Sequence, residues 1–262
     1  MHSKIQSIIS QLEQYKGIHV LYACESGSRA WGIPSSDSDN DVRFIYTHPA
    51  DWYLSLSKRR DTISITRDGI DLVGWDLRKT FQLMKKSNAA ALEWMNAPII
   101  YHKSPGFLRQ FREIGQSCCS PNALNFHYMS IAKKFYDACA NEEFVKIKTW
   151  FYALRAVLNC RWVITHQQVP PMMLQDTLSL VNADLEKEIL SLIAAKSAKE
   201  ESFLIKKSAS LTNFIEASIQ LSETYKNKLP HNKVNMHAMD TFFKKMIHKK
   251  RSFPNQSKSY AA

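Results

Sequence analysis

The stretch GSRAWGIPSSDSDNDVRF, residues 27–44, decides the fold of this chain. The apolar and β-prone run 18–24 leads into it, and a second such run, 41–46, ends it. The pattern therefore predicts a strand, a tight polar turn, a short helix and a second strand. The small residues Gly27 and Ser28 let the backbone approach phosphate oxygens, and N–H groups at the following helix start and the Ser28 hydroxyl can donate to them. The junction after the first strand is the first candidate site.

Asp39 and Asp41 stand two residues apart at the start of the second predicted strand. Side chains alternate along a strand, so both carboxylates project from one face, while Val42 and Phe44 point into the core. Phosphoryl transfer needs cations to neutralise a triphosphate, and converging carboxylates hold such cations. We expect Asp39 and Asp41 to bind Mg²⁺ or Mn²⁺.

The first half of the chain alternates between helical and strand periods. A helix is expected over 3–15, a hairpin over 62–66 and 70–73, and a further short strand at 99–101. From Leu77 onward the period becomes helical. The predicted fold class is α+β: a small mixed sheet with helices on one face, followed by an all-helical domain.

Ser120 supplies an N-cap and Pro121 a first helical residue, which makes them the start of the helical domain. Further helices are expected at about 143–165, 184–195 and 199–226, with a break at Pro170-Pro171. The predicted boundaries are a catalytic domain over 1–119, a helical domain over 120–250 and a flexible tail over 251–262.

The composition and net charge limit the classes of protein to which this chain can belong. The chain has 262 residues and a formal charge of +11, which favours acidic partners such as nucleotides or nucleic acid. No apolar run approaches the roughly 18 residues of a membrane helix, and the start of the chain lacks a signal-peptide core, so we expect a cytoplasmic protein without membrane contact. The five cysteines show no C-x-x-C spacing and are expected to be buried thiols.

Gly-Ser followed by Asp-x-Asp beside a hydrophobic residue resembles the signature of the polymerase β-like nucleotidyltransferase superfamily. Within it, GSRAWG at 27–32 and DSDNDVRFIY at 37–46 are similar to the bacterial YcgL/RlaP group of predicted nucleotidyltransferases. Later blocks of that group are similar to 70–79, 86–94 and 148–155, and the resemblance covers about 15–180. Trp31 stands where many superfamily members carry Arg, so a phosphate contact is not expected there.

The resemblance implies a third metal-binding carboxylate on a neighbouring strand. Asp71 matches it as the polar residue of an apolar strand. Asp76 is the rival, but its place directly before the helix that starts at Leu77 suits an N-cap, which is the interpretation we favour.

Lys148, Tyr152 and Arg155 fall at helical spacing on one face, where they can meet the triphosphate or the base. A solvated helix face is the alternative, and the resemblance favours nucleotide binding. The expected nucleotide-binding residues are thus Gly27, Ser28, Arg29, Lys148, Tyr152 and Arg155.

The resemblance implies transfer of a nucleoside monophosphate from a nucleoside triphosphate to an acceptor, with release of pyrophosphate. An RNA end is one acceptor, and a protein or a small molecule stays open. A glycosyltransferase using Asp-x-Asp is an alternative that the Gly27-Ser28 pair disfavours, and a catalytically silent nucleic-acid-binding protein is a second. An EF-hand is disfavoured because its sixth position is Val42 and its twelfth is His48.

Overall fold

The computed structural model describes residues 1–57, 59–232 and 234–248. A five-stranded sheet with the order β3-β4-β2-β1-β5 forms its centre. The strands are β1 (His19–Ser26), β2 (Asn40–Thr47), β3 (Thr62–Arg67), β4 (Ile70–Asp76) and β5 (Ile100–Lys103). β2 runs parallel to β4, and the other neighbours are antiparallel, so the predicted mixed sheet is confirmed.

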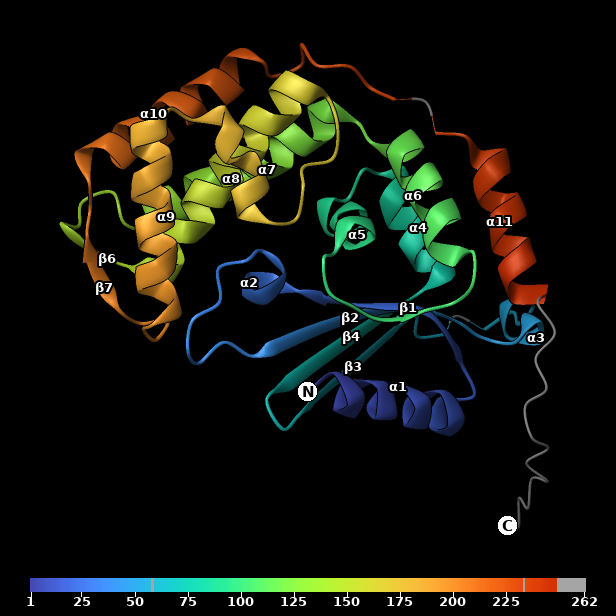
Figure 1. Ribbon diagram of the computed structural model, residues 1–262. Helices are drawn as coiled ribbons and strands as arrows, with labels where there is room; N and C mark the ends of the chain where they lie inside the picture. Colours follow the sequence, from blue (N-terminus) through green and yellow to red (C-terminus); the bar gives the residue numbers. More distant parts are fainter. Residues whose placement is uncertain (58, 233, 249–262) are drawn as a thin grey trace.

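Helices cover both faces of this sheet (Figure 1). On one face α1 (His2–Lys16) packs over Val42 and Phe44. On the other lie α4 (Leu77–Lys85), α5 (Ala89–Glu93) and α6 (Phe107–Cys118). The expectation of helices on one face was therefore wrong. Ile45 is buried on the face of the sheet opposite Phe44. A strand with apolar side chains on both faces must be covered on both sides.

The region after residue 120 is mainly helical, as predicted. Its helices are α7 (Pro121–Asp137), α8 (Ile147–His166), α9 (Ala183–Ser197) and α10 (Ala209–Thr224), with a 3-10 segment η2 (Leu174–Leu180). The Ser120 side chain accepts a hydrogen bond from the Ala123 N–H, which confirms the predicted start of α7.

A two-stranded ribbon was missed by the sequence analysis. It consists of β6 (Phe144–Lys146) paired with β7 (Leu204–Lys206). The helices expected from 143 and 199 consequently begin at Ile147 and Ala209. Each strand has only three residues, too few to show a period of two that would distinguish it from a helix start.

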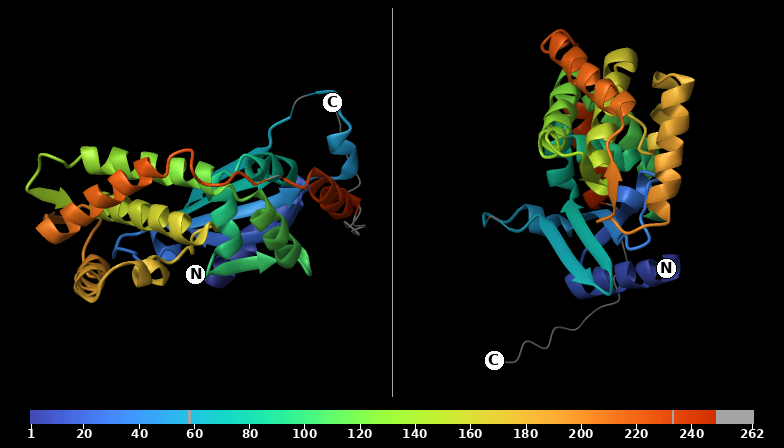
Figure 2. Two further views of the ribbon diagram at one scale, coloured as in Figure 1. Left: turned by 90° about the horizontal axis from the view of Figure 1, so that it is seen from above. Right: turned by 90° about the vertical axis from the view of Figure 1, so that its left-hand side faces the viewer.

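The last described helix, α11 (Met236–His248), returns to the sheet region. It falls in the range assigned to the helical domain, yet the Phe242 ring packs against Phe81 of α4 and Phe107 of α6, at centroid distances of 6.0 and 5.6 Å. Seen from above, α11 lies at the end of the molecule away from α9 and α10 (Figure 2). The flexible tail predicted over 251–262 lies outside the described residues.

All five cysteines are free and buried, as expected from their spacing. Among the residues that the structure describes, no helix has the length and apolar character needed to cross a membrane.

Candidate active site

Asp41 and Asp71 lie side by side on the sheet. β2 and β4 are parallel, and their register sets Asp41 directly against Asp71. Neighbouring strands are about 4.8 Å apart, and paired residues point to the same face. Asp39 is exposed in the loop before β2, where a carboxylate oxygen lies 3.9 Å from the point at which a Cβ of Gly69 would stand. The structure brings two of the three expected carboxylates together.

Arg43 joins these two carboxylates. Its Nη2 lies 2.9 Å from Asp41 Oδ1, and its Nη1 lies 3.0 Å from Asp71 Oδ2. Arg43 Nη1 also donates to the Asp71 backbone carbonyl at 3.1 Å. Arg43 follows Asp41 by two residues, so both side chains leave the strand on the same face. A positive charge thus already occupies the position between the paired acids.

Gly27 lies against the Asp41 carboxylate at the end of β1. A Cβ at this position would stand 2.1 Å from Asp41 Oδ2, and the backbone has a φ of +62°. A side chain at position 27 would collide with Asp41, and the positive φ also disfavours any residue other than glycine. Gly27 opens the short helix α2 (Gly27–Ala30), on which Arg29 is exposed, and Ser28 Oγ donates to Ser38 Oγ at 3.1 Å.

Glu25 supports Asp41 from beneath and was missed by the sequence analysis. The side chain is fully buried, and its Oε1 accepts the Asp41 backbone N–H at 2.7 Å, while Oε2 accepts the Tyr101 hydroxyl. Burial raises the pKa of Glu25. An acid in an otherwise apolar strand is a signal that could have identified it.

The loop that leads to Asp39 is held by a buried lysine of the helical region. Lys196 of α9 is 1 % exposed, and its Nζ donates to the Ile33 carbonyl at 2.7 Å and to Ser35 Oγ at 2.6 Å. Burial lowers the pKa of Lys196. Lys196 lies seven residues after the buried Ile189, so its place on an apolar helix face is visible in the sequence.

The turn after α9 adds further contacts to the same loop. The Lys199 carbonyl accepts from the Ser36 N–H at 3.1 Å, and Asp37 Oδ1 accepts from the Glu201 N–H at 3.1 Å. Glu201 also forms a hydrogen-bonded ion pair with Lys148. The hydrogen bond to Glu201 raises the pKa of Lys148, and the negative charge of Asp41 adds a smaller increase. Loop 33–38 is therefore shaped jointly by β2 and the helical region.

The three candidates on α8 lie in different surroundings. Lys148 is half exposed beside Glu201, whereas Arg155 is 7 % exposed. Arg155 Nη2 lies 3.2 Å from Glu93 Oε1, and its guanidinium lies 4.2 Å from the centre of the Trp31 ring. Tyr152 meets the same Trp31 edge to face at 5.2 Å, and burial raises the pKa of Tyr152.

A cavity of about 270 Å³ opens between these side chains and the end of β1. The residues that line it include Ser26, Trp31, Glu93, His127, Tyr152 and Arg155. In the described structure, Arg155 Nε and Trp31 Nε1 are buried donors without a hydrogen-bond partner. Buried polar groups are nearly always paired, and these two nitrogens are exceptions that surrounding protein atoms cover.

Asp76 caps α4 as expected. Its Oδ1 accepts the Arg78 N–H at 2.8 Å, and its Oδ2 accepts the Tyr53 hydroxyl at 2.5 Å. Asp76 lies opposite Tyr46, five residues along β4 from Asp71. That places it at the far end of the strand from the Asp41–Asp71 pair.

Known proteins match the sequence of this chain over most of its length. The family described as "RlaP: RNA repair pathway DNA polymerase beta family" matches residues 1–245. The chain belongs to this family. It is 38% identical over 226 residues to the "Uncharacterized protein YcgL" of Bacillus subtilis (strain 168), a match that covers 84% of this chain and 86% of that protein. The expected relationship to the YcgL/RlaP group is confirmed.

A solved structure, of a nucleotidyltransferase-like protein from Exiguobacterium sibiricum 255-15, is 12% identical. It aligns with 97% of this chain and 82% of its own, at a TM-score of 0.32. The two backbones are thus only loosely alike.

Polymerase β-type chemistry implies a divalent metal, and the site fits one in its donor chemistry. Asp41 and Asp71 supply oxygen ligands, which are the ligands that Mg²⁺ takes in proteins. Among the described residues, however, no three His, Cys, Asp or Glu side chains are grouped to hold a metal ion. Asp39 stands apart, and Arg43 supplies the positive charge between the other two.

We predict that Gly27→Ala lowers turnover by about a hundredfold, because the new Cβ displaces the Asp41 carboxylate. Gly17→Ala is the matched control, since Gly17 has a φ of +59° and no atom within 4 Å of its Cβ position. Both variants should lose about 1–2 kcal/mol of unfolding free energy from backbone strain. Steady-state kinetics and chemical denaturation measure the two effects. Equal turnover in both variants would contradict the assignment.

We predict that Lys196→Met weakens nucleotide binding at least about tenfold without lowering the melting temperature. Methionine fills the same space and removes the cost of a buried charge, but it cannot donate to Ile33 and Ser35. Lys199→Met, at an exposed side chain of the same turn, is the control. Calorimetric titration and thermal unfolding test the prediction. Normal nucleotide affinity in a folded Lys196→Met protein would show that Lys196 does not position the loop.

Proposed function

We propose that this protein transfers a nucleoside monophosphate from a nucleoside triphosphate to an RNA end, with release of pyrophosphate. The observation that carries the proposal is the pairing of Asp41 with Asp71 on one face, with the Gly27 backbone against the Asp41 carboxylate. Membership of a polymerase β family described as part of an RNA repair pathway supports it.

The cavity beside Trp31 suits the nucleoside end of the triphosphate. Its aromatic walls, Trp31 and Tyr152, offer faces and edges to a base. The Ser26 that lines this cavity precedes Gly27, so the phosphates would follow the β1–α2 turn toward Asp41.

In the proposed reaction the acceptor oxygen forms a bond to the α-phosphorus as the bond to the pyrophosphate oxygen breaks. Asp41, Asp71 and Asp39 would hold Mg²⁺ or Mn²⁺, which supplies neutralisation of the triphosphate charge. Glu25 fixes the Asp41 backbone, and Lys196 fixes the loop before Asp39. One of the three aspartates accepts the proton of the acceptor hydroxyl.

Lys148 and Arg43 are two partly exposed cationic side chains in this part of the structure. Each is ion-paired in the described structure, Lys148 with Glu201 and Arg43 with Asp41 and Asp71. On binding of a metal–triphosphate, Arg43 exchanges its carboxylate partners for phosphate oxygens, which are equally good partners for a guanidinium. This exchange keeps the site electrically balanced in both states.

The test is transfer of label from α-³²P triphosphates, supplied one at a time, to RNA, with sugar nucleotides as the comparison. We expect Asp41→Asn and Asp71→Asn each to lower transfer at least about a hundredfold. Asp68→Asn is the control, because Asp68 is an exposed carboxylate in the β3–β4 turn with a φ of +52°, which asparagine tolerates. Full activity in either paired-acid variant, or transfer from sugar nucleotides alone, would overturn the proposal.

Arg43→Gln should raise the affinity for Mn²⁺ in the absence of nucleotide. Two partly exposed ion pairs, each of up to about 1 kcal/mol, no longer compete with the ion, so the gain is up to about thirtyfold. Electron paramagnetic resonance titration of free Mn²⁺ measures it without turnover. Arg67→Gln is the control, because Arg67 is exposed on β3 beside Asp68. Unchanged or weaker Mn²⁺ binding in Arg43→Gln would show that arginine and metal do not compete.

A further inference from the structure

A basic face lies at the end of the molecule where α4, α6 and α11 meet the loop after α3 (Ala50–Tyr53). Its exposed side chains include Arg59, Arg60, Lys85, Arg109 and Lys245. None of these five forms an ion pair with a described residue. We call these residues, together with Arg78, the basic face.

Two acids near the basic face are neutralised by ion pairs, whereas Asp51 of α3 and Glu113 of α6 are exposed and form no ion pair with a described residue. Asp61 is paired with Lys79 at 2.9 Å, and Asp240 is paired with Lys244 at 2.5 Å. The unpaired cations therefore keep their full charge toward solvent. A surface with this excess of positive charge attracts polyanions over several ångströms.

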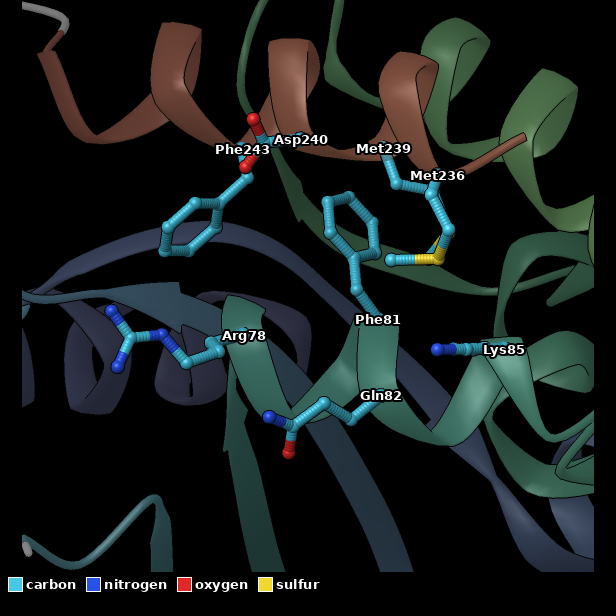
Figure 3. A pocket seen from close by; sticks show the side chains of 8 residues that line it. All are labelled: Arg78, Phe81, Gln82, Lys85, Met236, Met239, Asp240 and Phe243. Carbon is cyan, nitrogen blue, oxygen red and sulfur yellow. The ribbon is translucent and has the colours of Figure 1, made fainter. Parts of the chain in front are cut away.

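The basic face is hollowed by adjoining cavities. One of about 400 Å³ lies between α4 and α11, where Arg78 and Lys85 flank the rings of Phe81 and Phe243 (Figure 3). A second of about 330 Å³ shares Arg78 and is also lined by Arg59. A third of about 480 Å³ lies between α6 and α11 and is lined by Arg109 and Lys245.

An aromatic platform stands beside the second cavity. The Trp52 ring stacks on His48 at 4.0 Å with an interplanar angle of 9°, and Arg59 lies 5.8 Å from the Trp52 ring centre. Basic groups interleaved with aromatic rings are the pattern that binds a sugar-phosphate backbone and its bases. An acidic protein segment would need neither the aromatic stack nor so many separated cations.

The basic face is too far from the paired acids to contact a bound triphosphate. Asp71 lies beside Asp41, and Asp76, the N-cap of α4, lies five residues further along β4. At about 3.3 Å per residue this is about 17 Å along the strand. The charge of the basic face therefore has no role in nucleotide binding.

We propose that the basic face binds the ribose-phosphate backbone of the RNA acceptor, away from the end that reacts. This inference rests on the proposed RNA acceptor and adds a docking surface to it. The face holds the body of the RNA by its phosphates, while the end reaches the Asp41–Asp71 pair. Contacts to phosphates carry little sequence information, so recognition at this face is by charge and shape.

The experiment compares two triple variants of the full chain. Arg60, Lys85 and Arg109 are each changed to Gln in the first. The control changes three exposed lysines elsewhere, Lys16→Gln, Lys187→Gln and Lys228→Gln, and removes the same charge. Binding of a labelled RNA hairpin with single-stranded tails is measured by fluorescence anisotropy over a range of salt concentrations. Triphosphate binding is measured in parallel.

We expect the basic-face variant to bind the RNA at least about tenfold more weakly, with a salt slope lower by about two, since about 0.7 is lost per phosphate contact. The control should keep the wild-type affinity, and both variants should bind triphosphate normally. Equal RNA affinity in the wild type and the basic-face variant, or equal weakening in the control, overturns the inference. If the wild type binds triphosphate but no RNA, the docking surface fails, while nucleotidyl transfer to another acceptor stands. If it binds RNA at this face but no triphosphate, the proposed reaction fails instead.

Discussion

The parallel pairing of β2 with β4 is the constraint on which the rest of the site depends. It sets Asp41 against Asp71, and a slip of one residue would turn one carboxylate toward α1 and into the core. The antiparallel pairing of β1 with β2 then sets Ser26 against Asp41, so the chain must turn at Gly27 directly over the carboxylate. The strand register by itself therefore explains why position 27 is a glycine, without a bound ligand.

The helical region completes the site and does more than cover it. The Lys196 side chain extends from α9 to the loop before β2. Burying its charge is unfavourable, and two short hydrogen bonds offset that cost. The Lys199 carbonyl and the Glu201 N–H extend the same contact. Because the loop leads directly to Asp39, the position of a candidate metal ligand depends on residues about 160 positions later in the chain.

The parts of the site that local periodicity determines could be predicted from the sequence. The strands around Gly27 and Asp41 and the N-cap at Asp76 follow from alternation and from capping, whereas Asp71 was expected as the third acid from the family resemblance. The bridging geometry of Arg43 and the loop contact of Lys196 could not be predicted, because each depends on which distant residue the fold brings alongside. The packing of α11 against the sheet region could not be predicted for the same reason, because it depends on a contact between residues far apart in the sequence.

Arg155 is a charged residue near the candidate site whose guanidinium is buried in an ion pair. It is 7 % exposed and paired with Glu93, which also accepts the Tyr128 hydroxyl at 2.7 Å. Removing either member of so buried a pair leaves an uncompensated charge, which typically costs about 3–5 kcal/mol. Arg155 therefore cannot swing toward a triphosphate without exposing Glu93. The ion pairs of Arg43 and Lys148 carry no such constraint, because their carboxylate partners stay accessible to water when the pair opens.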